Sequence, residues 1–471
     1  MTEALPARPT GLLPRVAWTR EPAPGWTVPA LPAAPARGAH RGRRRRWSAG
    51  LAGLLAVLCA VGVTGGADAP VPAPAAVVAP AADPCGPTWV RAWQASVQPG
   101  GAELSGATLR MVVHPQVTGD EVRVRLSNRF GAGPLVIGNV AAGRSDGSAG
   151  VLPGSTRDVP FGGARGVTIP PGGEVTSDPV PLDVTAGRPV AVSLHVVGAP
   201  GVVATHPVAL QTSYVVPGRD VTAAPTVAAL AEETGSWFVL TGLDVWTARP
   251  VSAVVAVGDS ITDGVGAPVG AEQRWPDALA GRLSGAGGST EMAVLNAGLA
   301  GNRLLAPDPA ADVDSPLARF ADDVAAAAGV TDVVLNIGTN DLAAGRSAAE
   351  VIAGLQAFAD RARAAGKRVL LSTITPSTTG PHGTRAAIAA REEINEWVRT
   401  EGLAHADGIV DFAAAVADPA DPRRLAPTYD AGDGLHLSAA GYRAMAAALD
   451  PALLSGSPCR ADRTSAVVAA G

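Results

Sequence analysis

The alternation of apolar and polar residues changes near residue 250 of the chain. Residues 88–249 consist of short β-branched runs separated by Gly, Pro, Asn and Asp. In the run 121–127, apolar residues take every second position and Arg or Ser most of those between, which is the period of a strand with one wet face. Comparable runs lie at 108–114, 189–195 and 237–245. This pattern predicts a β-sandwich domain over residues 88–249.

After residue 250, apolar strands alternate with helical stretches. The predicted strands cover residues 251–257, 292–295, 332–337, 368–373 and 408–411. The predicted helices cover residues 275–283, 317–328, 348–365, 386–400 and 439–453. Alternating units of this kind predict an α/β domain over residues 250–455, in which a mostly parallel sheet carries helices on both faces. Residues 456–471 are expected to form a C-terminal tail.

The first 69 residues have the build of an export signal. A cationic stretch ending at Arg46 precedes an apolar run, residues 51–63, and a small-x-small exit that ends at Ala69. We expect cleavage after Ala69, secretion, and no stable membrane anchor. A retained signal anchor is the alternative, but spanning a bilayer needs roughly 18 or more apolar residues and this run is shorter. The doubled arginines leave both Sec and twin-arginine export open.

The sequence after the predicted signal indicates a linker and a disulfide. The segment 70–87 is rich in Ala, Pro and Val without a hydrophobic period, which predicts a semi-rigid linker. Cys85 and Cys459 are the two cysteines that follow the signal. In an oxidising compartment we expect them to form a disulfide, with two unpaired thiols as the alternative. Two cysteines without clustered histidines offer too few ligands for a metal ion, so no metal site is expected.

The charge of the chain excludes one class of partner. Lys and Arg number 37 against 42 Asp and Glu, a net charge of −5, and many of the arginines lie in the export signal. The remaining chain is therefore acidic and offers no general basic surface for nucleic acid.

Four polar blocks follow predicted strands or precede the last predicted helix. They read GDSITDG at 258–264, NAGLAGNR at 296–303, GTND at 338–341 and DGLHLS at 433–438. Ser260 lies at a strand-to-helix turn, where its hydroxyl is lifted from the sheet edge beside backbone amides. The three-residue spacing allows Asp433 to bind one imidazole nitrogen of His436, while the other nitrogen faces Ser260 as general base. Taken alone, Ser260 is better explained as a helix cap, because serine is among the commonest capping residues.

Together and in this order, the blocks GDS, NAGLAGN, GTND and DGLH resemble the SGNH hydrolases, also called the GDSL esterase and lipase family. The resemblance covers residues 251–454 and implies an SGNH-type, flavodoxin-like sheet. It implies that Ser260 is the nucleophile, His436 the base and Asp433 the residue that orients the base. Ile261 stands where the family name has leucine, a change between apolar residues of similar size. In LSNRFG at 126–131 and PPGG at 170–173, the β-rich first domain is similar to the accessory region of secreted actinobacterial members, a resemblance that implies no residue roles.

The same resemblance implies an oxyanion hole made of the Ser260 and Gly298 amides and the Asn340 side chain. Asn302 and Arg303, in the second block, are candidates for lining the substrate cleft, with a surface salt bridge as the alternative for Arg303. The chemistry requires no cofactor and no metal.

The expected function is therefore that of a secreted serine esterase with no cofactor. Aromatic residues make up only 4% of the chain and no apolar lid segment is evident, which favours short acyl esters or acetylated glycans as substrates. The alternatives are a GDSL lipase acting on longer acyl chains, and a carbohydrate-binding module attached to an inactive hydrolase domain. A nucleotide site is disfavoured because the first block lacks the lysine of a phosphate loop.

Overall fold

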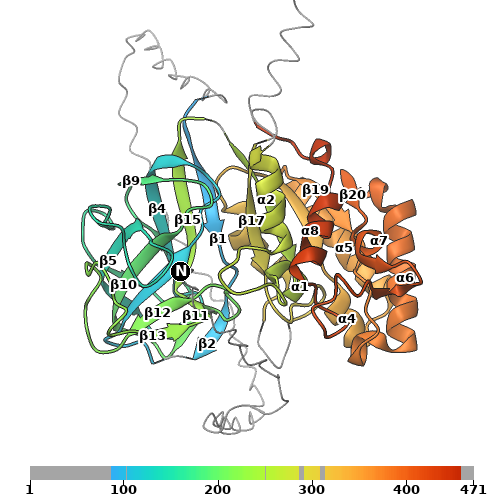
Figure 1. Ribbon diagram of the computed structural model, residues 1–471, viewed down its shortest axis with the longest axis horizontal. Helices are drawn as coiled ribbons and strands as arrows, with labels where there is room; N and C mark the ends of the chain where they lie inside the picture. Colours follow the sequence, from blue (N-terminus) through green and yellow to red (C-terminus); the bar gives the residue numbers. More distant parts are fainter. Residues whose placement is uncertain (1–85, 102, 250, 286–290, 308–312, 458–471) are drawn as a thin grey trace, which may run out of the picture. The chain divides into compact units, whose positions relative to one another are not determined.

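The computed structural model describes residues 86–101, 103–249, 251–285, 291–307 and 313–457, all within one compact unit, Ala79–Gly471 (Figure 1). The predicted export signal, most of the predicted linker, Cys85, Cys459 and most of the predicted tail lie outside these residues. Within them, no helix has both the length and the apolar character required to cross a membrane. The domain boundary near residue 250 stays a prediction.

The region from residue 88 to 249 is built from antiparallel strands. They are β1 (Thr88–Gln94), β2 (Gln98–Gly101), β3 (Thr108–Val113), β4 (Gly119–Ser127), β5 (Leu135–Arg144), β6 (Arg157–Asp158), β7 (Val167–Ile169), β8 (Glu174–Thr176), β9 (Val180–Val184), β10 (Val190–Gly198), β11 (Val202–His206), β12 (Ser213–Val216), β13 (Glu232–Thr234), β14 (Trp237–Phe238) and β15 (Leu240–Thr247). One sheet has the order β1-β15-β4-β8, with β9 beside β4; a second has the order β13-β12-β3-β10-β5-β6, with β7 beside β5; a third is β14-β11-β2.

The alternation along β4 explains how the first sheet packs. Val122, Val124 and Leu126 are buried, whereas Arg123 and Arg125 between them are partly exposed. The buried side of β4 shares one hydrophobic core with residues of β3, β5 and β10 from the second sheet. The prediction of a β-rich region of antiparallel sheets is confirmed.

Residues after 250 form a parallel sheet with helices. Its strands are β16 (Ser252–Gly258), β17 (Met292–Gly298), β18 (Val330–Asn336), β19 (Arg368–Ser372) and β20 (Gly408–Val410), in the order β17-β16-β18-β19-β20. The helices are α1 (Ser260–Asp263), α2 (Trp275–Gly285), α3 (Pro316–Phe320), α4 (Thr339–Ala343), α5 (Ala348–Ala364), α6 (Arg385–Thr400), α7 (Phe412–Val416) and α8 (Ala439–Ala448). A short antiparallel pair, β21 (Ala417–Asp418) and β22 (Asp421–Leu425), follows α7.

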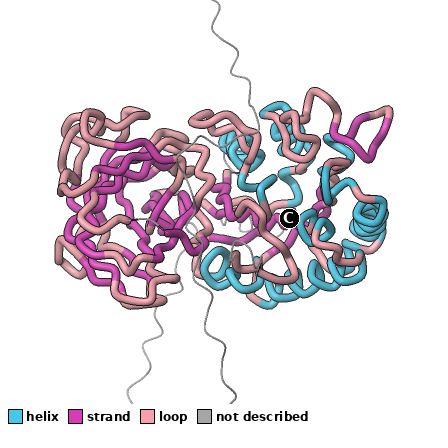
Figure 2. Tube along the Cα trace, turned by 90° about the horizontal axis from the view of Figure 1, so that it is seen from below, coloured by secondary structure: helices cyan, strands magenta, loops and turns pink. Residues whose placement is uncertain are grey.

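Helices cover both faces of this sheet (Figure 2). Along β16, Ala253, Val255 and Val257 share a core with α5 and α6, whereas Val254 and Ala256 share another with α2 and α8. The strands are therefore apolar on both sides, as in parallel sheets of α/β proteins. The predicted fold class is confirmed, and each predicted strand is present within a few residues.

The predicted helix at 317–328 differs from the structure. Helix α3 ends at Phe320, a π-helical turn follows at Ala321–Ala325, and the chain turns at Gly329 with φ +75° before entering β18. Two carboxylates of this turn contact the β-rich region, as described below, so tertiary contacts rather than helical period shape the segment.

Candidate active site

Ser260 begins the short helix α1 directly after β16. The Asp259 side chain accepts a hydrogen bond from the Ile261 amide and caps the turn, and Gly264, with φ +105°, ends it. Ser260 is only 7% exposed, and its Oγ lies 2.9 Å from Nε2 of His436. The carboxyl end of the strand thus presents the hydroxyl to an imidazole from a loop 176 positions later.

His436 is held by Asp433 of the same loop. Its Nδ1 lies 2.6 Å from one carboxylate oxygen of Asp433. The other oxygen accepts hydrogen bonds from the Leu435 and His436 amides at 2.9 and 2.8 Å. Burial raises the pKa of Asp433, but these hydrogen bonds outweigh it and hold that pKa below its ordinary value. An ionised Asp433 makes Nδ1 of His436 a donor and leaves Nε2 as the acceptor that a general base requires.

Close backbone packing brings the nucleophile turn against the end of β17. A Cβ added at Gly298 would lie 2.2 Å from the Asp263 backbone nitrogen, and one added at Gly258 would lie 2.1 Å from Oγ1 of Thr262. Such separations are far below van der Waals contact. Only glycine at these two strand ends allows α1 to lie where it does.

The Gly298 amide is engaged elsewhere, which argues against its expected role as an oxyanion donor. Its N–H donates to Oδ1 of Asn296 at 2.8 Å. In the same loop, Gly301 adopts φ +77°, and its amide has no hydrogen-bond partner among the described residues. The sequence pattern alone does not show that Gly298 is needed for close packing whereas Gly301 has the free amide.

Asn340 lies at the start of α4, behind Gly338 with φ +123°. Its Nδ2 donates to the Asn302 carbonyl at 3.0 Å, which uses one of two protons and leaves the other for a ligand. Its Oδ1 lies 3.4 Å from Nε2 of His382, a histidine for which we predicted no role. Because the Asn302 carbonyl can only accept, it fixes which end of the Asn340 amide is the donor.

Asn302 does not line a cleft, contrary to expectation. It is 0% exposed; its Nδ2 donates to the Asp314 carbonyl at 2.8 Å, and its Oδ1 accepts from Arg319 at 2.6 Å. Its amide is consumed by the protein interior, so it supports the loop instead of meeting substrate. Arg303 is half-buried, and its charge lies near the Asp341 carboxylate.

Two buried carboxylates lie next to the site; the sequence suggested only turn-stabilising hydrogen bonds for Asp263 and no role for Asp341. Asp341 accepts hydrogen bonds from the Leu304 and Leu305 amides at 2.8 and 3.0 Å, and Asp263 accepts one from the Ala300 amide at 3.0 Å. Burial raises the pKa of Asp341 above its ordinary value. Both carboxylates bind the loop after β17. In the sequence, only their places near the blocks pointed to the site: Asp341 directly follows GTN, and Asp263 lies two residues after GDSI.

Burial also affects Asp259. It raises the pKa of this carboxyl to about 7, an effect that the neighbouring carboxylates Asp341 and Asp263 increase.

Within the described residues, no three His, Cys, Asp or Glu side chains are arranged to hold a metal ion.

Comparisons with known proteins concern mainly the second half of the chain. Residues 256–444 match the model of the GDSL-like lipase/acylhydrolase family. No match was found among curated proteins. Among solved structures, a GDSL-like lipase from Bacteroides thetaiotaomicron is 22% identical, covering 43% of this chain and 87% of that one, with a TM-score of 0.33. A carbohydrate acetylesterase family member from Sinorhizobium meliloti is 21% identical, covering 43% and 97%, with a TM-score of 0.34.

A third structure covers more of the chain. An active-site mutant of a family two carbohydrate esterase from Clostridium thermocellum is 15% identical and covers 78% of this chain and 93% of that one, with a TM-score of 0.32. The family match spans all four blocks of the site, from the strand that presents Ser260 to helix α8 beyond His436. The chain therefore contains a GDSL-like lipase/acylhydrolase domain at residues 256–444.

Proposed function

We propose that this acylhydrolase is a secreted serine esterase that forms an acyl-enzyme on Ser260 and favours short acyl or acetylated carbohydrate substrates. The observation that carries the catalytic assignment is the continuous contact from Ser260 Oγ through the His436 ring to the Asp433 carboxylate. No neutral serine hydroxyl is a strong nucleophile, and a base in hydrogen-bond contact with an orienting carboxylate is how such a hydroxyl is activated.

In the proposed reaction, Oγ of Ser260 attacks the ester carbonyl carbon as its proton passes to Nε2 of His436. The carbonyl electron pair moves onto oxygen, where the Ser260 amide and the second Nδ2 proton of Asn340 stabilise it, with the Gly301 amide as third donor in place of Gly298. Collapse of this intermediate expels the alcohol, which takes the proton from His436. Water then gives a proton to His436 and attacks the acyl-serine, releasing the acid and restoring Ser260.

The surface composition supports a preference for short acyl groups. Among the described residues, the exposed large hydrophobic side chains are Leu152, Val197, Val202, Leu230, Val269 and Leu403. None of them belongs to the four blocks, whereas a long acyl chain needs a continuous apolar groove beside the nucleophile.

Hydrolysis of p-nitrophenyl acetate by the purified chain and by Ser260→Ala tests the enzyme assignment. Equal phenolate release by both proteins would disprove the nucleophile assignment. A series of p-nitrophenyl esters of increasing acyl length, with acetylated xylan in parallel, tests the substrate preference. Highest turnover on the longest chains would favour a lipase, and binding to polysaccharide without turnover would favour a binding module.

Export and the disulfide are separate parts of the proposal. We propose cleavage after Ala69 and pairing of Cys85 with Cys459, on the sequence pattern alone. Intact mass of the protein recovered from culture medium, with and without reduction and alkylation, tests both. A mass that includes the apolar run, or two thiols that alkylate without reduction, would contradict them.

A further inference from the structure

We infer that the β-rich region is a positioning part of the catalytic site, because its residues Ser96 and His206 hold the loop of residues 299–302 from both sides of Gly301. This inference rests on the proposed function, since it assigns the loop to the oxyanion side of an esterase site. It gives the β-rich region a role in the reaction that sequence blocks alone do not suggest.

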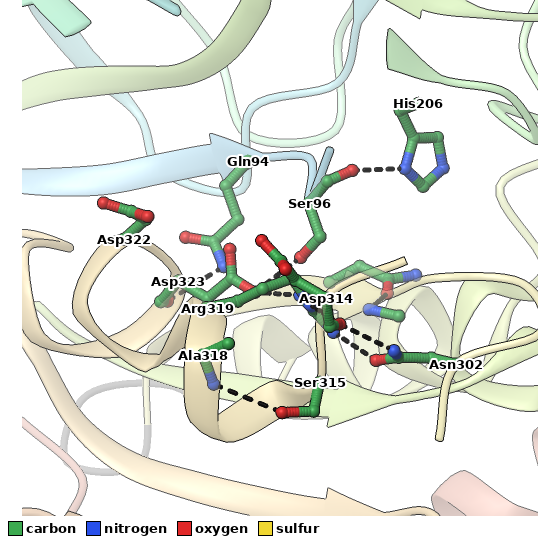
Figure 3. Close-up of polar contacts among 12 residues, drawn as sticks. Gln94, Ser96, His206, Asn302, Asp314, Ser315, Ala318, Arg319, Asp322 and Asp323 are labelled. Carbon is green, nitrogen blue, oxygen red and sulfur yellow. Dashed lines mark hydrogen bonds and ion pairs between the residues drawn. The ribbon is translucent and has the colours of Figure 1, made fainter. Parts of the chain in front are cut away.

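Two series of contacts connect the β-rich region to residues 299–302, one through His206 and one through Asp323. Both begin at Ser96, which follows β1 (Figure 3). It is buried; its carbonyl oxygen lies 2.8 Å from Nδ1 of His206, and its hydroxyl donates to Oδ2 of Asp323 at 2.9 Å. The neighbouring Gln94 donates from its side chain to the Asp323 carbonyl at 3.1 Å. One end of strand β1 is therefore joined to the buried His206 ring and to the partly buried Asp323 carboxylate.

The first series of contacts runs through His206 to the nucleophile turn. Nε2 of His206 lies 3.0 Å from Oδ1 of Asp263, the last residue of the helix that Ser260 begins. The other oxygen of Asp263 accepts the Ala300 amide at 3.0 Å. His206, only 4% exposed, thus fixes a carboxylate that joins the Ser260 turn to the residue before Gly301.

The contacts of His206 determine its charge. Nδ1 faces the Ser96 carbonyl, and Nε2 faces the Asp263 carboxylate and, at 3.2 Å, the Val208 carbonyl. A backbone carbonyl can only accept, and one carbonyl faces each ring nitrogen, so both nitrogens donate and the ring is an imidazolium. Burial opposes this charge, but Asp263 and the two carbonyls outweigh burial and raise the pKa of His206 above its ordinary value.

Other charged groups near His206 are already paired or neutral. A cavity of about 30 Å³ is lined by His206, Asp263, His114, Glu272, Arg274 and Asp277, among others. Arg274 bridges Glu272 and Asp277 at 3.0 Å each, and burial lowers the pKa of His114, which favours its neutral form. Asp263 is therefore the anion that balances His206, and loss of either partner would leave a buried uncompensated charge.

The second series of contacts runs through Asp323 to the other side of Gly301. Asp323 pairs with Arg319, which is 2% exposed and donates from Nη2 to Oδ1 of Asn302 at 2.6 Å (Figure 3). The Asn302 carbonyl in turn accepts from Nδ2 of Asn340. The residue after Gly301 and the side chain of Asn340 are thus oriented through a buried arginine that Ser96 helps to hold.

These contacts matter because residues 299–302 form a turn outside any helix or strand. Oxyanion donors act only when they are placed before charge develops, and misplacement by about 1 Å can cost about a hundredfold in rate. A loop held at Ala300 and Asn302 keeps the intervening amide in one orientation. The geometry therefore makes His206 a positioning residue that acts through Asp263, not a catalytic one.

The test compares His206→Phe and His206→Gln with wild type on p-nitrophenyl acetate, with kcat expressed per active site titrated by an organophosphonate. Phenylalanine removes both donors, whereas glutamine can restore one toward Asp263. We expect kcat to fall about tenfold to a hundredfold in His206→Phe with KM changed less than about threefold, and His206→Gln to recover part of the loss. If His206→Phe does not fold, the kcat and KM of His206→Gln decide the question.

Arg129→Gln is the matched control. Arg129 of the β-rich region pairs with Asp314, at 2.8 Å, and Asp322, so it connects the same two segments while more exposed and without touching residues 299–302. Its kcat should stay within about twofold of wild type. With an active wild type, an unchanged kcat in His206→Phe would overturn the inference alone, as would an equal loss in Arg129→Gln. If His206→Phe does not fold, an unchanged kcat in His206→Gln has the same meaning. A wild type no faster than Ser260→Ala would overturn the proposed function and the inference together.

Discussion

Oγ of Ser260 and Nε2 of His436 lie 2.9 Å apart although 176 positions separate them in the chain. The contact requires that the first strand of the parallel sheet and the loop before the last helix end at the same edge. Asp433, in the same loop, contacts the other ring nitrogen of His436. Ser260, His436 and Asp433 therefore have different roles, and their substitution should lower the rate by different factors.

Substitution within this chain should separate the base from the residue that orients it. Ser260→Ala and His436→Ala should each lower kcat by about 10⁶-fold, whereas Asp433→Ala should cost about 10⁴-fold, because orientation is a smaller loss than the base itself. The 53% exposure of the Asp433 side chain, where water can partly replace the carboxylate, supports the smaller loss. Steady-state hydrolysis of p-nitrophenyl acetate measures all three. A loss in Asp433→Ala equal to that in His436→Ala would contradict the assigned roles.

Asn340→Ala should slow catalysis without greatly weakening substrate binding. The side chain is expected to bind the oxyanion, which exists only after attack, so the loss should appear in kcat at about a hundredfold, or about 3 kcal/mol. His382→Ala should have a smaller effect in the same direction, because it removes one of two contacts of the Asn340 amide and leaves the hydrogen bond to the Asn302 carbonyl. Michaelis curves for both variants provide the measurement, and a change confined to KM would argue against an oxyanion role.

Gly298→Ala should destabilise the protein. The added methyl would lie 2.2 Å from the Asp263 backbone nitrogen, so either β17 or the Ser260 turn must move, at a cost of about 1–3 kcal/mol or more. Thermal unfolding should show a lower midpoint together with reduced activity. Gly281→Ala is a suitable control, because a Cβ there meets no atom within 4 Å. Equal midpoints for the two variants would show that the turn accommodates the methyl group.

The His206–Asp263 pair should make stability depend on pH in one direction. The pKa of His206 is raised in the folded protein, so its contribution to the free energy of unfolding is complete below the unfolded pKa of about 6.5. Above that value the folded state binds more protons than the unfolded state, and the contribution is lost as pH rises through the folded pKa. Urea unfolding from pH 6 upward should show this decline in wild type and a weaker one in His206→Gln. Parallel curves for the two proteins would contradict the assignment of charge.

Local pattern was sufficient for the elements and for the catalytic candidates. Alternation along residues 121–127 predicted β4, and apolar runs bounded by polar blocks predicted the five parallel strands, because burial on one or both faces leaves a period in the chain. Strand ends gather at one sheet edge, so topology predicts that Ser260 and Asn340 lie together, whereas the place of His436 was predicted from the DGLH block and the family resemblance.

Only the tertiary structure shows which backbone amide or side chain of each block is available to contact the substrate. Gly298 and Gly301 are equivalent in a sequence pattern, yet the Asn296 side chain engages only the first amide. The sequence predicts Asn302 as a cleft residue, but Arg319 occupies its side-chain oxygen in the interior. The hydrophobic pattern around His206 does not predict its contact with Asp263. Periodicity records whether a position is buried but not which distant side chain meets it there, because such pairing depends on the packing of segments far apart in the chain.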